Sequence, residues 1–372
     1  MKVLFVFGTR PEAIKMAPMV NALRNEEQFF ETRVCISAQH REMLDQVIRF
    51  FEIGIDHDLD LMRPGQTLYA LTSRLIDGIQ KVIEQERPDL VMVQGDTTTA
   101  FAGALCAYYC QVKVAHIEAG LRSGNPMSPF PEEANRKMIA ALSHYHFAPT
   151  ENARANLERE GISNGIYVVG NTVIDALFMG LKMVEQDDHK YSDHFRYLDL
   201  SKKTVLVTGH RRESFGEKFR SLSRAIASIA DEHSDIEFVY PVHLNPEVQV
   251  PVYEILGNKK NIHLINPLPY PELIWLLNHS TLILTDSGGI QEEAPALGKP
   301  VLVMRDVTER TEGIEAGTAK LVGTDEASII KHMKILLSDY DVYEKMANAI
   351  NPYGDGNSSE RIKQILMNEG LN

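Results

Sequence analysis

Cysteine is scarce in this chain of 372 residues, which contains only Cys35, Cys106 and Cys110. Three cysteines cannot form a disulfide framework, and no CxxC pair offers a zinc site. We therefore expect a cytoplasmic protein with reduced thiols. Cys106 and Cys110 lie one helical turn apart in an apolar stretch, which favours buried and unreactive side chains.

Long apolar runs are also missing, and none approaches the roughly 18 residues that a membrane span requires. The short apolar run 1–7 leads directly into Gly8 and a polar segment, so we interpret it as a first core strand and not as a signal peptide. Basic residues are in deficit, because 38 Lys and Arg face 51 Asp and Glu, and the net charge is −13. A surface of this sign repels phosphate backbones, so we expect neither nucleic acid nor a membrane as a partner.

Several motifs of cofactor and hydrolase chemistry are absent from the sequence. No GxGxxG follows a predicted strand, which argues against bound NAD, and the lack of a P-loop lysine motif argues against ATP hydrolysis. Neither a GxSxG turn nor an HExxH helix occurs. No spacing of His, Cys, Asp or Glu indicates a metal. The sequence therefore predicts an activity without a bound cofactor or metal.

What the sequence does contain is a regular alternation of short apolar runs and amphipathic helical segments. This alternation predicts an α/β fold of doubly wound parallel sheets with helices on both faces. Because single cores rarely exceed about 250–300 residues, the length predicts two domains, with a boundary near residues 168–176. We interpret the polar stretch 187–197 as a surface connection. The predicted strands are 3–7, 32–37, 90–94, 112–117, 146–148, 204–208, 236–241, 262–265, 281–285 and 301–304.

The segment that follows the predicted strand 281–285 is suited to binding an anion. Ser287, Gly288 and Gly289 lie where that strand ends and a helix begins. Small residues there let backbone N–H groups and the helix dipole contact a diphosphate. Glu293 lies about one turn into the helix, where its carboxylate is placed to accept both hydroxyls of a ribose. The alternative interpretation is a plain glycine turn followed by a solvated glutamate.

Basic side chains follow other predicted strands. Arg10 comes directly after the first strand, where its guanidinium can pair with phosphate, and Lys15 lies on the same helix. An interdomain salt bridge and an exposed lysine are the alternatives. His210 and His243 follow two strands of the second half. His210 stands beside two arginines, which disfavour its protonation, although it can still donate to phosphate; a structural histidine is the alternative.

Acidic side chains follow three strands of the first half. Asp96, Glu118 and Glu132 with Glu133 each come after a predicted strand end. Carboxylates that converge at one edge of a sheet are what proton transfer requires. Each one alone has an alternative role as a helix cap or first-turn acid. Together they favour a functional explanation, because like charges at one site destabilise a fold.

Short strings that run in order over almost the whole chain match one enzyme family. They are GTRPEAIKMAP (8–18), AQHREMLDQV (38–47), GDTTT (95–99), HIEAGLR (116–122), PFPEEANR (129–136), GNTVIDAL (170–177), GHRRE (209–213), YPVHLNP (240–246), TDSGGIQEEAP (285–295) and NPYGDG (351–356). In these strings the chain closely resembles the UDP-N-acetylglucosamine 2-epimerases of the non-hydrolysing bacterial type. The resemblance implies a GT-B fold, two Rossmann-like domains with the nucleotide in an interdomain cleft, and a homodimer. It assigns residues 1–168 and a returning helix 355–372 to the N-terminal domain, and 169–354 to the UDP-binding domain.

The reaction implied by the resemblance interconverts UDP-N-acetylglucosamine and UDP-N-acetylmannosamine, which supply cell-surface polysaccharide. The C2 proton is not next to a carbonyl, so simple deprotonation gives no stabilised anion. Elimination avoids this problem, because UDP leaves C1 as a base removes the C2 proton, and UDP then adds back to 2-acetamidoglucal. The resemblance makes four residues catalytic: Asp96, Glu118, Glu132 and His210. It makes the following residues contacts of the UDP-sugar: Arg10, Lys15, His243, Ser287, Gly288, Gly289, Glu293 and Arg310.

Two questions stay open at this stage. The residues do not divide the two proton transfers among the three carboxylates. Some family members also have a regulatory UDP-N-acetylglucosamine site. Gln39, Gln66 and Arg211 match it, but Glu42 replaces a glutamine and Gly65 an arginine. Activation by substrate is therefore a question. Thr311 stands where the family has proline, which we interpret as a minor change in a loop.

Three rival functions predict different observations. A hydrolysing epimerase of the same fold would let water attack the intermediate and release free N-acetylmannosamine and UDP. A GT-B glycosyltransferase would need an acceptor and would have no use for Asp96, Glu118 and Glu132 together. A nucleotide-sugar sensor would bind without turnover. The extent of the match favours the non-hydrolysing epimerase.

Overall fold

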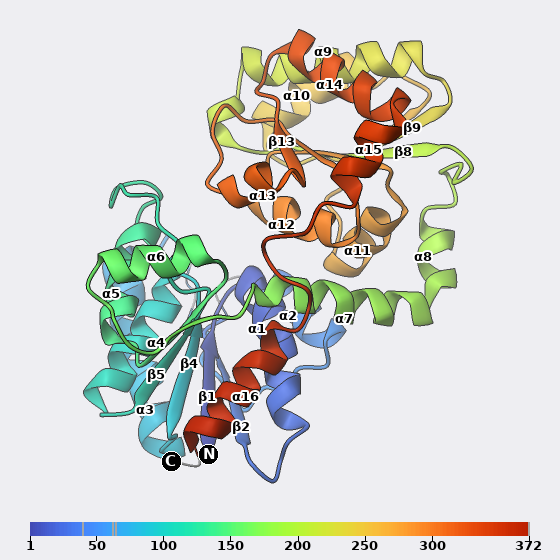
Figure 1. Ribbon diagram of the computed structural model, residues 1–372. Coiled ribbons are helices and arrows are strands. Elements are labelled where there is room, and N and C mark those ends of the chain that lie inside the picture. Colours follow the sequence, from blue (N-terminus) through green and yellow to red (C-terminus); the bar gives the residue numbers. More distant parts are fainter. Residues whose placement is uncertain (39–40, 62, 64, 371–372) are drawn as a thin grey trace. The chain divides into compact units, whose positions relative to one another are not determined.

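The computed structural model describes residues 1–38, 41–61, 63 and 65–370 and divides into two compact units (Figure 1). Unit 1 comprises Met1–Met179 and Tyr353–Asn372, and unit 2 comprises Gly180–Pro352. Each unit holds one parallel sheet with helices between its strands, which confirms the predicted α/β class. Within the described ranges, no helix has both the length and the apolar character that a membrane crossing needs.

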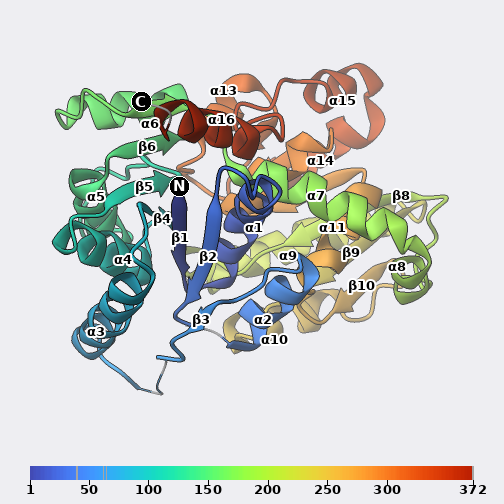
Figure 2. The same cartoon turned by 90° about the horizontal axis from the view of Figure 1, so that it is seen from below.

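The sheet of unit 1 has seven strands in the order β3-β2-β1-β4-β5-β6-β7. Its central strands are continuous apolar runs because helices cover both faces. Figure 2 shows α3, α4 and α5 on one side of these strands and α1 on the other, where the last helix, α16, packs against α1. The elements are β1 (Lys2–Phe7), α1 (Arg10–Arg24), β2 (Glu31–Ile36), α2 (Arg41–Phe50), β3 (His57–Asp58), α3 (Leu68–Glu86), β4 (Leu90–Gln94), α4 (Thr98–Tyr109), β5 (Lys113–Ile117), α5 (Glu132–Leu142), β6 (Tyr145–Ala148), α6 (Glu151–Arg159), β7 (Ile166–Val168), α7 (Thr172–Gln186, which continues into unit 2) and α16 (Ser358–Gly370).

The sheet of unit 2 has six strands in the order β10-β9-β8-β11-β12-β13, which is the strand order of a Rossmann fold. Its core packs α9 and α14 against β8 and β9. The elements are α8 (Asp188–His194), β8 (Lys203–Thr208), the 3₁₀ turn η1 (Arg212–Ser214), α9 (Glu217–Glu232), β9 (Ile236–Pro241), α10 (Pro246–Leu256), β10 (Ile262–Ile265), α11 (Tyr270–His279), β11 (Leu282–Thr285), α12 (Gly288–Ala296), β12 (Val301–Val303), α13 (Thr311–Ala316), β13 (Ala319–Leu321), α14 (Glu326–Ser338) and α15 (Tyr340–Ala347).

The boundary between the units lies after Met179, beyond the predicted end of the first domain at residue 168. Residues 169–179 stay with unit 1 because they bind its returning C-terminal segment. The Asn171 N–H donates to the Tyr353 carbonyl (2.7 Å). The buried carboxylate of Asp175 accepts the N–H groups of Ser358 (3.2 Å) and Ser359 (2.7 Å), which begin α16. These bonds anchor the last helix to unit 1.

Residues 187–197 are mostly exposed, as predicted for a surface connection, but two of their aromatic side chains, Tyr191 and Phe195, are buried. This stretch contains the helix α8, and Phe195, just after it, is 1% exposed. The Phe195 ring stacks on Trp275 at a centroid distance of 4.8 Å, and the indole N–H of Trp275 donates to Asp188 (2.7 Å). The polar composition hid a short helix whose aromatic side is buried against α11.

Three strands were not predicted from the sequence, namely β3, β7 and β13. Each has only two or three residues and is an edge strand, β3 and β7 in the sheet of unit 1 and β13 in that of unit 2. Runs of this length carry no measurable periodicity. They become strands because a neighbouring strand supplies hydrogen-bonding partners.

Candidate active site

Each sheet has one point at which the strand order reverses. In unit 1, β1 and β4 are neighbours, and the chain continues from them toward opposite edges of the sheet. In unit 2, β8 and β11 have the same relation. Ligands of doubly wound folds bind beyond the carboxyl ends of such strand pairs. The predicted site residues lie mainly in the segments that follow these strands.

The segments after β1 and β4 are joined through Glu12, a buried residue in the first turn of α1. Its carboxylate accepts the N–H groups of Gly8 (3.1 Å) and Thr9 (2.8 Å) and the hydroxyl of Thr97 (2.7 Å). Burial raises the pKa of Glu12, and these hydrogen bonds oppose the rise. Arg10 begins α1 beside this network. Glu12 was not predicted as a site residue, although its place three residues after Thr9 is the signature of a capping box.

Glu118, which follows β5, is the most connected of the predicted catalytic residues. Its backbone has φ +63°, a left-handed conformation that residues other than glycine rarely adopt. The Lys15 ammonium donates to both of its carboxylate oxygens (2.6 and 2.7 Å), and Asn171 donates to one of them (3.0 Å). Gln94, the last residue of β4, also donates to it. Lys15, which was predicted to contact substrate, is thus the counter-ion of Glu118.

Asp96 follows β4 and has a different cation. The guanidinium of Arg136 lies 2.6 Å from Asp96 Oδ2 and 3.0 Å from Glu133 Oε2. Glu133 is fully buried and also accepts the N–H groups of Ser123 and Gly124, so its role is structural. Arg136 therefore pairs with Asp96, and the buried Glu133 fixes the position of Arg136. Arg136 was not predicted, although it lies in the quoted string 129–136.

Glu132 is the first residue of α5. Its Oε2 atom is buried and has no hydrogen-bond partner among the described residues. Asp96 and Glu118 each have an ion-pair partner in unit 1, so the three predicted catalytic carboxylates have different electrostatic environments. A buried oxygen without a donor is costly unless a ligand or water satisfies it.

In unit 2, the segments after β8 and β11 are joined through Asp286. Its Oδ2 atom accepts the backbone N–H groups of His210 and Arg211, both at 2.7 Å. The His210 ring stacks near that of His243 with 5.7 Å between centroids. Burial lowers the pKa of His210, the positive charge of Arg211 and the neighbouring His243 lower it further, and Asp286 and Glu213 oppose this. The direction agrees with the prediction that His210 resists protonation.

The helix α12 begins at Gly288, as the anion-binding interpretation of residues 285–293 requires. Ser287 is its N-cap and makes no side-chain capping bond. The backbone N–H groups of its first turn therefore have no acceptor in the helix itself. Glu293 is buried on this helix and accepts the Tyr270 hydroxyl (2.7 Å). Arg310 pairs with the buried Glu292 of the same helix.

Comparison with known proteins identifies the family. The family model described as UDP-N-acetylglucosamine 2-epimerase matches residues 21–367. The chain belongs to this family. It is 53% identical to the UDP-N-acetylglucosamine 2-epimerase of Escherichia coli K12, and the alignment covers 100% of both chains.

Solved structures of the epimerase family agree with this assignment. The UDP-GlcNAc 2-epimerase from Neisseria meningitidis bound to UDP-GlcNAc is 48% identical, with a TM-score of 0.91 over 99% of this chain and 100% of that chain. The MnaA–UDP co-structure from S. aureus is 47% identical, with a TM-score of 0.87 over 100% of this chain and 97% of that one. The glycosyltransferase SnogD from Streptomyces nogalater shares only the fold, at 17% identity and a TM-score of 0.57 over 98% of this chain and 99% of that one. The family's GT-B fold of two Rossmann-like domains is therefore the fold of this chain.

The residues predicted for a regulatory site in this family lie in different parts of the chain. Glu42 is exposed in the first turn of α2. Gln66 precedes α3 and accepts a hydrogen bond from Arg74. Arg211 belongs to unit 2, where its side chain donates to the Asp286 carbonyl (3.4 Å). Gln39 lies outside the described residues. A regulatory site therefore stays a prediction for this epimerase-family chain.

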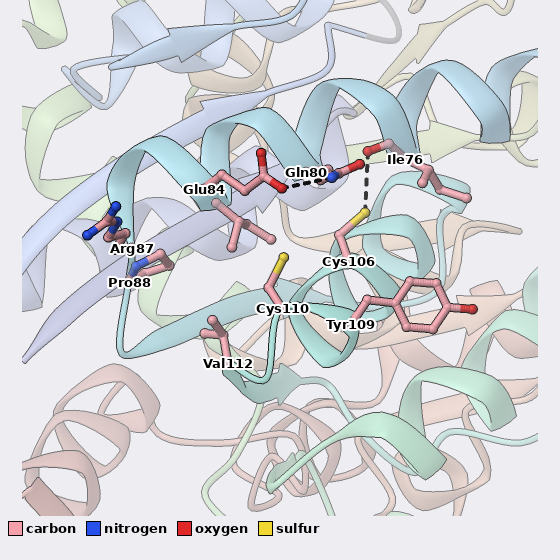
Figure 3. Close-up of a pocket in the computed structure, with 10 residues that line it drawn as sticks. Ile76, Gln80, Glu84, Arg87, Pro88, Cys106, Tyr109, Cys110 and Val112 are labelled. Carbon is pink, nitrogen blue, oxygen red and sulfur yellow. Dashed lines mark hydrogen bonds between the residues drawn. The ribbon is translucent and has the colours of Figure 1, made fainter.

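A cavity of about 620 Å³ in unit 1 contains none of the predicted site residues (Figure 3). It lies beside Pro88 and Val112, which precede β4 and β5, and hence at the strand ends opposite those that carry Asp96 and Glu118. Cys106 and Cys110 line it, and Figure 3 shows both sulfur atoms directed toward α3. The Cys106 thiol donates to the Ile76 carbonyl (3.5 Å).

The thiols lead to a prediction about alkylation. Burial raises the pKa of Cys35 and of Cys106 to about 12, and it also raises the pKa of Cys110. At about pH 8, a thiol with such a pKa is ionised roughly 10³-fold less than a free cysteine, and only the thiolate reacts. We expect iodoacetamide to label Cys110 first and Cys35 and Cys106 only after denaturation, as peptide mass spectrometry would show. Labelling of native Cys106 at the rate of a free thiol would contradict this prediction.

Proposed function

We propose that this protein catalyses the reversible epimerisation of UDP-N-acetylglucosamine at C2, which gives UDP-N-acetylmannosamine. The observation that carries the proposal is the family membership over residues 21–367, together with catalytic residue types at the strand ends of both units. The relatives from Neisseria meningitidis and S. aureus were solved with UDP-GlcNAc and with UDP. This supports the same ligands for the present chain.

In the proposed reaction, unit 2 binds the nucleotide. The first turn of α12 presents the backbone N–H groups of Gly288 and Gly289, and the helix dipole adds partial positive charge for the diphosphate. Glu293 accepts the ribose hydroxyls, and Tyr270 holds its carboxylate in place. Diphosphate binding matters for catalysis, because UDP is the leaving group and must be retained for the second step. The remaining contacts of the UDP-sugar are Arg10, Lys15, His243, Ser287 and Arg310.

Unit 1 supplies the proton transfers. A carboxylate takes the C2 proton while the C1–O bond breaks, and UDP leaves with the bonding electron pair to give 2-acetamidoglucal. In the return step, a UDP oxygen attacks C1, and a second group delivers a proton to the opposite face of C2. Asp96, Glu118 and Glu132 are the proposed acid–base groups, and His210 assists the diphosphate. Lys15 forms an ion pair with Glu118, and Arg136 forms one with Asp96.

The proposal also covers the compartment of the enzyme, its oligomeric state and the use of its product. We infer a cytoplasmic homodimer whose product supplies N-acetylmannosamine-type sugars for cell-surface polysaccharide. Free Cys35, Cys106 and Cys110 are consistent with a reducing compartment.

The test is proton NMR of UDP-N-acetylglucosamine with the enzyme in D₂O, without an acceptor or an added cofactor. We expect a mixture of the two UDP-sugars with deuterium at C2, because the C2 proton exchanges with solvent while it resides on a carboxyl group. Free N-acetylmannosamine with UDP would instead indicate the hydrolysing reaction. An unchanged substrate that keeps its C2 proton would contradict the epimerase proposal and favour a glycosyltransferase or a sensor.

A further inference from the structure

The buried carboxylate of Asp286 has two oxygens in different situations. Asp286 follows β11 and is 1% exposed. Its Oδ2 atom accepts the N–H groups of His210 and Arg211 at 2.7 Å each and so fixes the turn after β8. Its Oδ1 atom is buried and makes no full hydrogen bond among the described residues. A buried carboxylate oxygen without a donor is costly, so a donor within reach is strongly favoured.

One donor within reach of Oδ1 is the imidazole of His210. Its Nδ1 atom lies 3.3 Å from Asp286 Oδ1, and the two residues are held together by the backbone bond from His210 to the same carboxylate. If Nδ1 carries the proton, it satisfies Oδ1. The proton on a neutral ring is then committed to Nδ1, and Nε2 is left with its lone pair. A neutral histidine carries only one ring proton, so the partner of one nitrogen decides the state of the other.

We propose that Asp286 is a positioning residue that holds the proton of His210 on Nδ1, so that Nε2 takes up a second proton when a diphosphate binds. The inference rests on the proposed function, in which His210 assists the diphosphate of the UDP-sugar. Asp286 does not contact the ligand in this scheme. It acts through His210 by selecting the tautomer and by balancing the charge of the imidazolium.

The charged and titratable groups around His210 in unit 2 favour this change in the protonation of its ring. Asp286 faces it from the β11–α12 segment and His243 from the segment after β9, and Arg211 and Glu213 are its chain neighbours. Burial, Arg211 and His243 keep the pKa of His210 below its ordinary value, so the ring of the free protein is neutral at slightly alkaline pH. A bound diphosphate adds negative charge and thereby favours the protonated ring. Binding therefore takes up a proton.

The substitution Asp286→Asn separates the two functions of this carboxylate. The amide oxygen can still accept the N–H groups of His210 and Arg211, so the turn is retained. The amide NH₂ then faces Nδ1 and can only donate, which moves the ring proton to Nε2 and opposes the imidazolium. We expect calorimetric titration with UDP at about pH 8, in buffers of different ionisation enthalpy, to show uptake of about one proton per UDP by the unchanged protein and close to none by Asp286→Asn. The ionisation of UDP itself cancels in this comparison.

The matched control is Asp175→Asn in unit 1. Asp175 is also a buried aspartate that accepts two backbone N–H groups, those of Ser358 and Ser359, and it belongs to the anchor of α16 and not to the site. We expect proton uptake in this variant to equal that of the unchanged protein. An equal loss in both variants would overturn the inference, because it would reflect a general cost of replacing buried aspartate.

Nitrogen-15 NMR of the histidine rings gives a second readout that needs no variant to fold. In the ligand-free protein at slightly alkaline pH, we expect the His210 signals of a ring protonated at Nδ1 and bare at Nε2. A ring protonated at Nε2 and bare at Nδ1 would overturn the inference even if UDP binds and turnover is normal. Conversely, the Nδ1-protonated ring in a protein that converts no UDP-N-acetylglucosamine would support the role of Asp286 and contradict the proposed function.

Discussion

Replacing Glu118 with glutamine is expected to reduce kcat for epimerisation by about 10²- to 10⁴-fold, the contribution of a general acid or base. Glutamine has the shape of glutamate but cannot take up a proton, and it removes the counter-ion of Lys15. The rate of deuterium incorporation at C2 in D₂O measures the proton transfer directly. We expect this rate to fall with kcat, whereas KM changes little.

The affinity for UDP serves as the internal control for Glu118→Gln. The residues proposed to bind UDP at α12 belong to unit 2, and Glu118 belongs to unit 1. A dissociation constant for UDP within about twofold of that of the unchanged protein, measured by calorimetry, would show that nucleotide binding is retained and that the loss is in chemistry. A variant that exchanges C2 protons at the original rate would exclude Glu118 from the proton transfers.

Replacing Gly120 with alanine is expected to destabilise unit 1 by about 3 kcal/mol or more, near the upper end for single substitutions. Gly120 follows Glu118 closely in the chain and has φ +89°, a conformation that costs about 1–2 kcal/mol for a residue with a side chain. A Cβ atom there would also lie 2.2 Å from the carbonyl oxygen of Ala153, in the backbone of α6. Backbone cannot yield as a flexible side chain can, so either the loop that carries Glu118 or α6 must move.

Gly124→Ala is the matched control in the same loop. Gly124 has φ +78°, but a Cβ atom there would meet nothing within 4 Å, so we expect a loss of only about 1–2 kcal/mol from the backbone conformation. Urea unfolding by circular dichroism measures both variants. The single tryptophan, Trp275, lies in unit 2, so its emission should be less affected than the dichroism. Equal midpoints for the two variants would contradict the predicted clash.

Strands with a local sequence pattern were predicted accurately. The predicted strands 90–94, 236–241 and 262–265 match β4, β9 and β10 to the residue. The residues of β4 and β9 are almost all buried, which makes their pattern unambiguous, whereas β10 is a partly buried edge strand that its short run of Ile and Leu indicates. The helix within residues 187–197 was not predicted for the opposite reason, because the burial of Phe195 against Trp275 depends on α11, a distant segment. The family assignment is confirmed, and the individual roles of the site residues stay predictions.

The residues that the sequence analysis missed share one property: their importance lies in their partners. Arg136 matters because it faces Asp96, and Asp286 matters because it faces His210. The Lys15–Glu118 pair joins residues 103 positions apart, and the Asp286 bond to His210 spans 76. No local pattern encodes such pairs, because they depend on which strands become neighbours in the sheet.

By itself, the sequence determined the fold class, the family and the set of chemical groups at the strand ends. Periodic burial and the rule that parallel strands place their carboxyl ends at one edge both act over short segments. Only the tertiary structure decided the electrostatic state of those groups. The strand order brings Lys15 to Glu118, Arg136 to Asp96 and Asp286 to His210. Among the residues that the structure describes, it leaves an oxygen of Glu132 without a donor. Charge and proton affinity depend on the distance to a partner and on burial, and the fold sets both.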